Sequence, residues 1–150
     1  MMNAEDLRMM AAALKEARIA LEEDEIPVGA VVACNGTIIG RGHNMTERLR
    51  DVTAHAEMMA ITAAAQTLGG KYLKDCTLYV TMEPCLMCAG AIAWSQVSRV
   101  VYGADDPRRG FQGLTVTDKP ILHPSTKLQG GLLASESLAM MREFFNSKRK

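Results

Sequence analysis

Cys85 and Cys88, three positions apart, are the residues of this sequence whose type and spacing most directly suggest chemistry. A pair of this kind at the start of a helix can be a redox couple, because the helix dipole lowers the pKa of a thiol. It can also supply two of the four ligands of a structural zinc site, or two of the three protein ligands of a catalytic one. The remaining interpretation is that both are small apolar residues buried in a helix.

The other possible metal ligands narrow these interpretations. The sequence has no second Cys-x-x-Cys pair, so a structural zinc site built from two such pairs is excluded by count. Of the three histidines, His43 ends an expected strand and His123 lies in a long loop. His55 differs because Glu57 follows it at the expected start of a helix, where both side chains could face one point. His55 is therefore the strongest candidate for a third ligand.

Two separated segments together match a known signature. They are "HAE" at 55–57 and "PCLMC" at 84–88, which fit His-x-Glu…Pro-Cys-x-x-Cys, the pattern of zinc-dependent nucleobase deaminases. In such enzymes zinc lowers the pKa of a bound water toward ~7, and the glutamate moves protons without binding the metal. The match implies that His55, Cys85 and Cys88 hold one zinc ion per chain. It also implies that Glu57 passes a proton from water to a ring nitrogen and then to the leaving amine.

The similarity extends beyond the metal signature, over roughly residues 7–149. It rests on "EIPVGAVV" (25–32), "GHN" (42–44), "TAHAEM" (53–58), "TLYVTMEPCLMCAGAI" (77–92), "RVVYGADD" (99–106) and the "FF" at 144–145 before a basic tail. In these segments the chain resembles the bacterial tRNA-specific adenosine deaminases, which belong to the cytidine deaminase-like superfamily. The resemblance implies a homodimeric hydrolase that converts the wobble adenosine of a tRNA anticodon loop to inosine and releases ammonia.

The same resemblance implies residues that bind the substrate. Asn44 and the backbone N–H of Ala56 match contacts to the flipped base, and Val28 and Pro84 lie in segments that match the pocket. Asp106 matches a loop aspartate used near the neighbouring nucleotide. Without the resemblance, Asn44 would be interpreted as a β-turn residue and Asp106 as a solvated loop acid.

Contacts to the RNA backbone must come from local clusters, because the 17 basic and 17 acidic residues cancel. The candidates are the basic residues after Asp106 and at the end of the chain, namely Arg108, Arg109, Lys148, Arg149 and Lys150. The alternative for the tail is a solvated helix end, where cations also suit the helix dipole. The sequence departs from the family at three positions: Val52 replaces a usual proline, Arg108 a usual lysine, and Lys148 a frequent arginine.

Two other functions stay open from the residues alone. A deaminase of the same fold that acts on a free base or nucleoside, such as guanine or cytosine, needs the same zinc site and glutamate. A zinc-stabilised RNA-binding module or inactive partner subunit is the non-enzyme alternative, and the intact Glu57 with three ligands argues against it. A thiol-redox protein is a more distant third interpretation.

The hydrophobic pattern indicates the elements that must position these residues. We expect helices over 3–23, 54–68, 85–94 and 135–148, and strands over 28–34, 37–43, 77–81, 99–103 and, weakly, 127–132. Asn35 and Gly36 predict a hairpin between the first two strands. The apolar faces expected for the first and last helices are Leu7, Met10, Leu14, Ala17 and Leu21, and Leu138, Met141 and Phe145. The long loop over 104–125 is expected to be functional or to contain a short element.

This order of elements predicts one α/β domain over residues 1–150. It would be a three-layer α/β/α sandwich, cytidine deaminase-like, with a mixed sheet of about five strands, antiparallel at the hairpin and parallel later. No apolar run approaches the ~18 residues of a membrane span, and the N-terminus lacks the pattern of a signal peptide. We therefore expect a cytoplasmic protein with no membrane partner.

Overall fold

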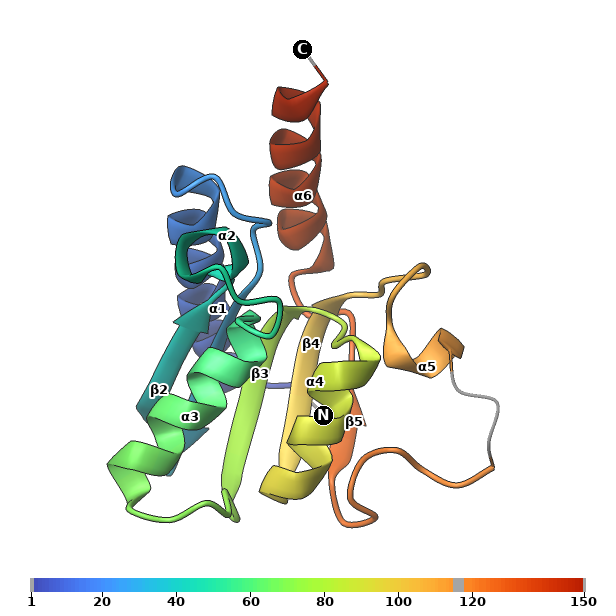
Figure 1. Cartoon of the computed structure of the whole chain (residues 1–150). Coiled ribbons are helices and arrows are strands. Elements are labelled where there is room, and N and C mark those ends of the chain that lie inside the picture. The colour runs from blue at the N-terminus through green and yellow to red at the C-terminus, as the bar shows by residue number, and fades with distance from the viewer. Residues whose placement is uncertain (1, 115–117, 150) are drawn as a thin grey trace.

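The computed structural model describes residues 2–114 and 118–149, which form a mixed sheet with helices on both faces (Figure 1). The helices are α1 (Ala4–Glu22), α2 (Thr46–Leu49), α3 (Ala56–Leu68), α4 (Leu86–Ser95), α5 (Phe111–Leu114) and α6 (Ala134–Lys148). The strands are β1 (Gly29–Cys34), β2 (Thr37–His43), β3 (Cys76–Met82), β4 (Arg99–Ala104) and β5 (Lys127–Gln129). The described part of the chain contains no helix with the length and hydropathy needed to cross a membrane.

The five strands lie in the order β2-β1-β3-β4-β5. The pairs β1–β2 and β1–β3 are antiparallel, and β3–β4 and β4–β5 are parallel. Asn35 and Gly36, both with positive φ (52° and 76°), form the predicted hairpin turn. The expected mixed sheet, antiparallel at the hairpin and parallel later, is confirmed.

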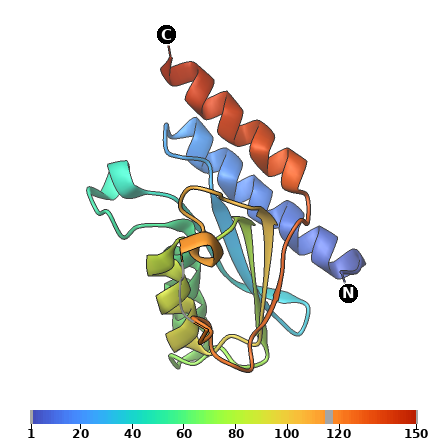
Figure 2. The same cartoon turned by 90° about the vertical axis from the view of Figure 1, so that its right-hand side faces the viewer.

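The helices form the two outer layers of a sandwich. Figure 2 shows the sheet nearly edge-on, with α1 and α6 on one side and α3 and α4 on the other. Alternate residues of β1 explain the two cores: Val32 packs toward α3 and α4, and its neighbour Val31 packs toward α1. The three-layer α/β/α prediction is therefore correct.

Glycines in β2 set how closely α3 approaches the sheet. A Cβ at Gly40 would overlap the Ala60 carbonyl oxygen, and one at Gly42 would meet the Ala56 carbonyl oxygen. Only a strand without these side chains lets the backbone of α3 lie directly on it. This contact fixes the start of α3 against the end of β2.

The expected apolar faces of the two helices in the other outer layer are correct only in part, since Met10 and Ala17 of α1 are buried as expected. In α1 the buried face is formed by Met9, Met10, Ala13, Ala17 and Ala20, while Leu7 is 48% exposed. In α6 the buried residues are Ser137, Met140 and Phe144. Leu138 and Phe145 are exposed instead. Both helices are rotated about one residue from the expected stripe.

The element boundaries also differ in places that matter for the site. The helices expected from 54 and 85 begin at Ala56 and Leu86, and the last strand ends at Gln129. The short helix α2 was not predicted. The helix α5 is a short element of the kind expected inside the long loop.

Candidate active site

The helices α3 and α4 lie on the same face of the sheet and begin near the same end of its strands (Figure 1). His55 is the N-cap residue of α3 and Cys85 that of α4, and both have extended backbone (φ −80°, ψ 157° and φ −73°, ψ 172°). Neither side chain makes a capping hydrogen bond, so both stay available as ligands. Thr53, two residues before His55, donates from its backbone amide and from its hydroxyl to Asp51 Oδ1.

The predicted ligands meet at these two helix starts. His55 Nδ1 lies 3.6 Å from Cys85 Sγ and 3.5 Å from Cys88 Sγ, and the three atoms all lie within 4.8 Å of one another. Ligands about 2.3 Å (sulfur) and 2.1 Å (nitrogen) from a tetrahedral zinc ion are roughly 3.6 Å apart. The arrangement and the soft donor set therefore fit zinc, with a fourth position left for water.

Protons distribute unevenly over this cluster. A hydrogen bond from Cys88 lowers the pKa of the Cys85 thiol to about 4, and the same bond raises the pKa of Cys88. Hydrogen bonding to Cys85 raises the pKa of His55. A metal ligand must be a thiolate or a neutral imidazole, so a metal ion must displace the protons of Cys88 and His55.

Glu57 lies beside the ligands, on the first turn of α3, and is 4% exposed. Burial raises the pKa of its carboxyl to about 7. A buried carboxyl with a pKa near neutrality can both accept and release a proton at physiological pH.

Asn44 connects the end of β2 to the start of α3. It is 8% exposed, and its Oδ1 accepts a hydrogen bond of 2.8 Å from the Ala56 amide. The backbone amide of Asn44 donates to the Val28 carbonyl oxygen at 3.1 Å, which brings three predicted substrate residues together. The Ala56 amide is already used by Asn44, so a contact between this amide and a base would have to replace that bond.

Pro84, directly before Cys85, contacts the loop that follows β4, and Asp106 belongs to that loop. The Pro84 carbonyl oxygen accepts from the Phe111 amide at 3.0 Å. Asp106 Oδ1 accepts from the backbone amides of Arg108 (3.1 Å) and Arg109 (3.0 Å). Asp106 therefore shapes its own turn, and both arginine side chains are exposed.

The basic tail is only partly free. Lys148 Nζ lies 2.7 Å from Asp24 Oδ2 and over the Phe144 ring, 5.5 Å from its centroid. Arg149 is exposed, and Lys150 lies outside the described residues. A contact between Lys148 and RNA would have to compete with the Asp24 pair.

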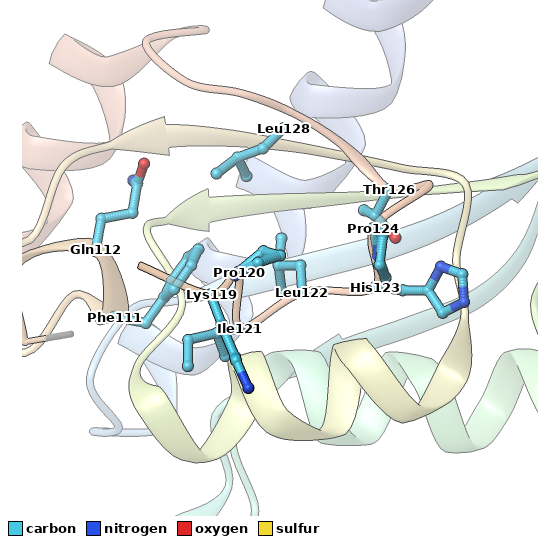
Figure 3. A pocket seen from close by; sticks show the side chains of 10 residues that line it. All are labelled: Phe111, Gln112, Lys119, Pro120, Ile121, Leu122, His123, Pro124, Thr126 and Leu128. Carbon is cyan, nitrogen blue, oxygen red and sulfur yellow. The ribbon is translucent and has the colours of Figure 1, made fainter. Parts of the chain in front are cut away.

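The other two histidines are placed away from the ligand cluster. His43 has a carboxylate at each ring nitrogen, Glu16 at 3.0 Å and Glu23 at 3.1 Å. Figure 3 shows His123 at one end of a pocket of about 420 Å³, with its ring turned away from Phe111. His123 Nδ1 lies 2.7 Å from Ser125 Oγ. Neither histidine belongs to the ligand cluster found among the described residues.

Sequence reasoning missed two buried glutamates next to the site. Glu25, 1% exposed, accepts from the backbone amides of Glu47 (3.1 Å) and Arg48 (2.8 Å). Glu83, 7% exposed, accepts from the loop after β4. Glu83 directly follows β3 and Glu25 precedes β1 by four residues, but an acid near the end of a strand does not identify its partner.

A family model and curated relatives match this chain. The model for the cytidine and deoxycytidylate deaminase zinc-binding region matches residues 3–104. The tRNA-specific adenosine deaminase of Agrobacterium fabrum is 45% identical over 148 residues, which are 97% of this chain and 97% of that protein. The enzyme of the same name from Bacillus subtilis is 42% identical over 148 residues, covering 97% of this chain and 92% of the relative.

Solved structures with the same fold include a tRNA:A34 deaminase and a guanine deaminase. One, from a study of A-to-I editing by tRNA:A34 deaminases at the wobble position of transfer RNA, superposes with a TM-score of 0.83 at 44% identity. The superposition covers 89% of this chain and 98% of the solved one. The guanine deaminase from Nitrosomonas europaea superposes with a TM-score of 0.78 at 27% identity, covering 96% and 85%. The predicted cytidine deaminase-like fold is confirmed.

Proposed function

Because the chain belongs to the family of tRNA-specific adenosine deaminases, we propose that it hydrolyses the wobble adenosine of a tRNA anticodon loop to inosine and ammonia. The cluster of His55, Cys85 and Cys88 with the buried carboxyl of Glu57 beside it supports the deamination chemistry. The 42–45% identity to tRNA-specific adenosine deaminases over nearly the whole chain supports the RNA substrate. The reaction is a hydrolysis of the C–N bond of a cyclic amidine. We expect the reaction to take place in the cytoplasm. We also expect residues 1–150 to form a single domain.

One zinc ion per chain is part of this proposal. His55, Cys85 and Cys88 would hold it, and their separations fit tetrahedral coordination. When bound, zinc activates the attacking water for addition to the base. The positive ends of α3 and α4 favour the two thiolates, because the N–H groups of both first turns point toward this edge.

Glu57 moves the protons of the reaction. Its carboxylate accepts a proton from the water that adds to C6 of adenine, and passes that proton to N1 of the ring. The carboxylate next takes the proton of the new C6 hydroxyl group and gives it to the exocyclic amine. The C6–N6 bond then breaks, the C6=O bond of inosine forms, and ammonia leaves. Water exclusion around this buried side chain (4% exposed) keeps the proton on the path between water and base.

The remaining residues bind and orient the base. The hydrogen bond to Ala56 fixes the side chain of Asn44, so its amide nitrogen is the end that meets the flipped adenine. Val28 and Pro84 line the pocket, and Asp106 lies near the neighbouring nucleotide. An adenine can reach this site only when it is splayed out of the stack, as in an anticodon loop. The RNA backbone is contacted by the exposed Arg108, Arg109 and Arg149. Lys148 contacts it as well once its ion pair with Asp24 is broken.

We also propose that two copies of the chain form a homodimer through α4. The sequence of this helix, "LMCAGAIAWS", has no charged residue. Its outer face presents Leu86 (47% exposed), Met87 (38%) and Trp94 (81%). Exposed apolar area of this kind on a helix is typical of a protein interface. A second copy offers the same uncharged face, as a two-fold symmetric contact requires.

The decisive experiment compares substrates. The purified protein is incubated with an anticodon stem-loop carrying a wobble adenosine, and in parallel with adenosine, guanine, cytosine and cytidine. Inosine in the RNA and released ammonia are measured. We expect turnover of the RNA alone, with affinity that falls moderately as salt rises. Turnover of a free base with no inosine in the RNA would reject the proposal.

Guanine deamination is the second candidate, because the guanine deaminase from Nitrosomonas europaea shares the fold. Its identity to this chain is 27%, against 44% for the tRNA:A34 deaminase structure. The guanine arm of the substrate experiment tests it directly. A zinc-stabilised binding module without activity is disfavoured, because such a module has no use for a buried proton acceptor at Glu57.

A further inference from the structure

A buried carboxylate joins the metal-binding segment to the loop that follows β4. Glu83 lies between the end of β3 and Pro84, and only 7% of the residue is exposed. Its Oε1 accepts from the Asp106 amide at 3.0 Å. Its Oε2 accepts from the Gln112 amide at 3.1 Å and from Gln112 Nε2 at 3.0 Å. One side chain therefore holds both ends of the loop over residues 106–112.

The 106–112 loop is shaped to receive this carboxylate. A Cβ at Gly110 would overlap the carboxyl group of Glu83 and crowd the Asp106 carbonyl oxygen. The Gly110 amide donates to that same carbonyl oxygen at 2.9 Å. The closed turn and the missing side chain leave room for the Glu83 carboxyl group. The contact is thus built into the loop and is not a chance approach of an acid.

The loop held in this way carries the basic side chains proposed to meet RNA. Inside it, Asp106 Oδ1 accepts from the amides of Arg108 and Arg109, and both arginines are exposed. Their positions relative to the zinc ligands depend on how the loop is anchored. Glu83 anchors it, and Cys85 lies only two residues after Glu83.

We propose that Glu83 is a positioning residue for RNA binding, whose carboxylate fixes the 106–112 loop relative to the zinc site. The proposal rests on the proposed function, because it assigns the loop to RNA. Glu83 is not assigned to the chemistry, since its carboxyl oxygens face the loop amides. The three N–H groups that donate to Glu83 need an acceptor at each of its two carboxyl oxygens. A glutamine at position 83 would offer an acceptor at only one of these two atoms.

The test is the variant Glu83→Gln, compared with wild-type protein in two assays. Trypsin cleavage after Arg108 and Arg109 reports how well the loop is held, without any RNA. Steady-state kinetics on the anticodon stem-loop separate KM from kcat. We expect trypsin cleavage about fivefold faster and KM about tenfold higher. Changes of about this size follow from the loss of one hydrogen bond to a charged group. We expect kcat within about twofold and the same zinc content.

A matched control separates positioning from stability. Asp6→Asn removes another buried carboxylate (1% exposed) on α1, on the opposite face of the sheet, and should lower stability without changing cleavage at the loop or KM. Equal effects of the two variants on cleavage and KM would overturn the proposal. Unchanged cleavage or unchanged KM in Glu83→Gln would overturn it too, as would loss of zinc.

A second variant covers the case in which Glu83→Gln does not fold. Gly110→Ala places a methyl group against the carboxylate from the loop side, and should raise KM and cleavage in the same direction. Wild-type values for that variant would overturn the proposal. If wild-type protein does not turn over RNA, the proposed function fails, while the cleavage comparison still reports on the anchoring of the loop.

Discussion

Asn44 Oδ1 accepts a hydrogen bond of 2.8 Å from the backbone amide of Ala56, the first residue of α3. The bond ties the end of β2 to the helix whose N-cap is His55, the only histidine in the ligand cluster found among the described residues. Because the side-chain oxygen is occupied, the side-chain nitrogen is the end expected to meet a base. One asparagine thus has a structural contact at one end and a proposed substrate contact at the other.

Two substitutions at Asn44 should separate these contacts. Asn44→Ala leaves the buried Ala56 amide without its acceptor, which should cost about 1–3 kcal/mol of unfolding free energy. Asn44→Asp keeps an acceptor for that amide and removes the donor, so stability should stay near wild type while kcat/KM on the stem-loop falls at least about tenfold. Urea unfolding and inosine assays measure the two effects. A fully active Asn44→Asp protein would contradict the substrate contact.

Glu57→Gln should separate proton transfer from metal binding. The amide is close in shape to the carboxyl but cannot move a proton, so kcat should fall by roughly 10²–10⁴-fold. Zinc content should not change, because the proposed ligands are His55, Cys85 and Cys88. Metal analysis and single-turnover inosine formation measure the two. Loss of zinc together with activity would mean that Glu57 is a ligand.

The metal cluster was predictable because chemistry imposes its residue types at short spacing. Cys85 and Cys88 are neighbours along one helix, and His55 precedes Glu57 by two positions. That His55 and Cys85 are themselves N-cap residues was not predicted. A cap is normally sought among Ser, Thr, Asp and Asn, and neither His55 nor Cys85 belongs to that group.

The faces of the outer helices were not predictable from the apolar stripe. A Cβ at Gly29 would overlap the Ala13 carbonyl oxygen of α1, so the helix backbone lies almost on β1. A contact this close is filled by alanines such as Ala13 and Ala17, and larger residues such as Leu7 face outward. The sequence pattern ranks leucine above alanine as a core residue and so selects the wrong face.

The contacts by which Glu83 and Glu25 hold their loops were not predicted from the sequence, for a different reason. The donors to Glu83 and Glu25 are mostly backbone amides, which every residue except proline carries. Asp106 and Gln112 lie more than 20 positions from Glu83, and nothing in their side chains marks this partner. Contacts between a buried acid and distant amides need the fold before they can be recognised.

Removal of zinc should loosen the starts of α3 and α4 together. Without the metal, His55, Cys85 and Cys88 no longer hold these two helix ends at one point. We expect chelation to abolish inosine formation and lower the Tm, and stoichiometric zinc to restore both. Cobalt substitution should give the visible absorption of a tetrahedral site with two thiolates. Full activity after complete metal removal would contradict the catalytic role.

The proposed dimer through α4 should depend on Trp94. This side chain is 81% exposed in the single chain, so Trp94→Glu should leave the fold intact and place charges against each other at the interface. Sedimentation or light scattering should change from a dimer to a monomer. Leu7→Glu is the matched control, because Leu7 is also exposed (48%) but lies on α1 in the opposite layer. A monomeric wild type, or a dimeric Trp94→Glu protein, would contradict the interface.

Acid stability should depend on Asp6, which joins α1 to the sheet. Its carboxylate accepts from Arg99 Nη1 at 2.8 Å and from the Tyr79 hydroxyl at 2.7 Å. The bond from Arg99 is the main cause that lowers the pKa of Asp6 from 3.8 to about 2. A carboxyl with a lowered folded-state pKa stabilises the fold above its unfolded pKa, and this stability is lost as the pH falls from about 4 through 2.

The shift corresponds to about 2 kcal/mol at neutral pH, of which about half should be lost at pH 3. Asp6→Asn cannot be protonated, so its deficit in unfolding free energy relative to wild type should shrink by about 1 kcal/mol between pH 7 and pH 3. Urea unfolding of both proteins at the two pH values measures this difference. A deficit that stays constant with pH would show that the ionised Asp6 carboxylate does not stabilise the fold.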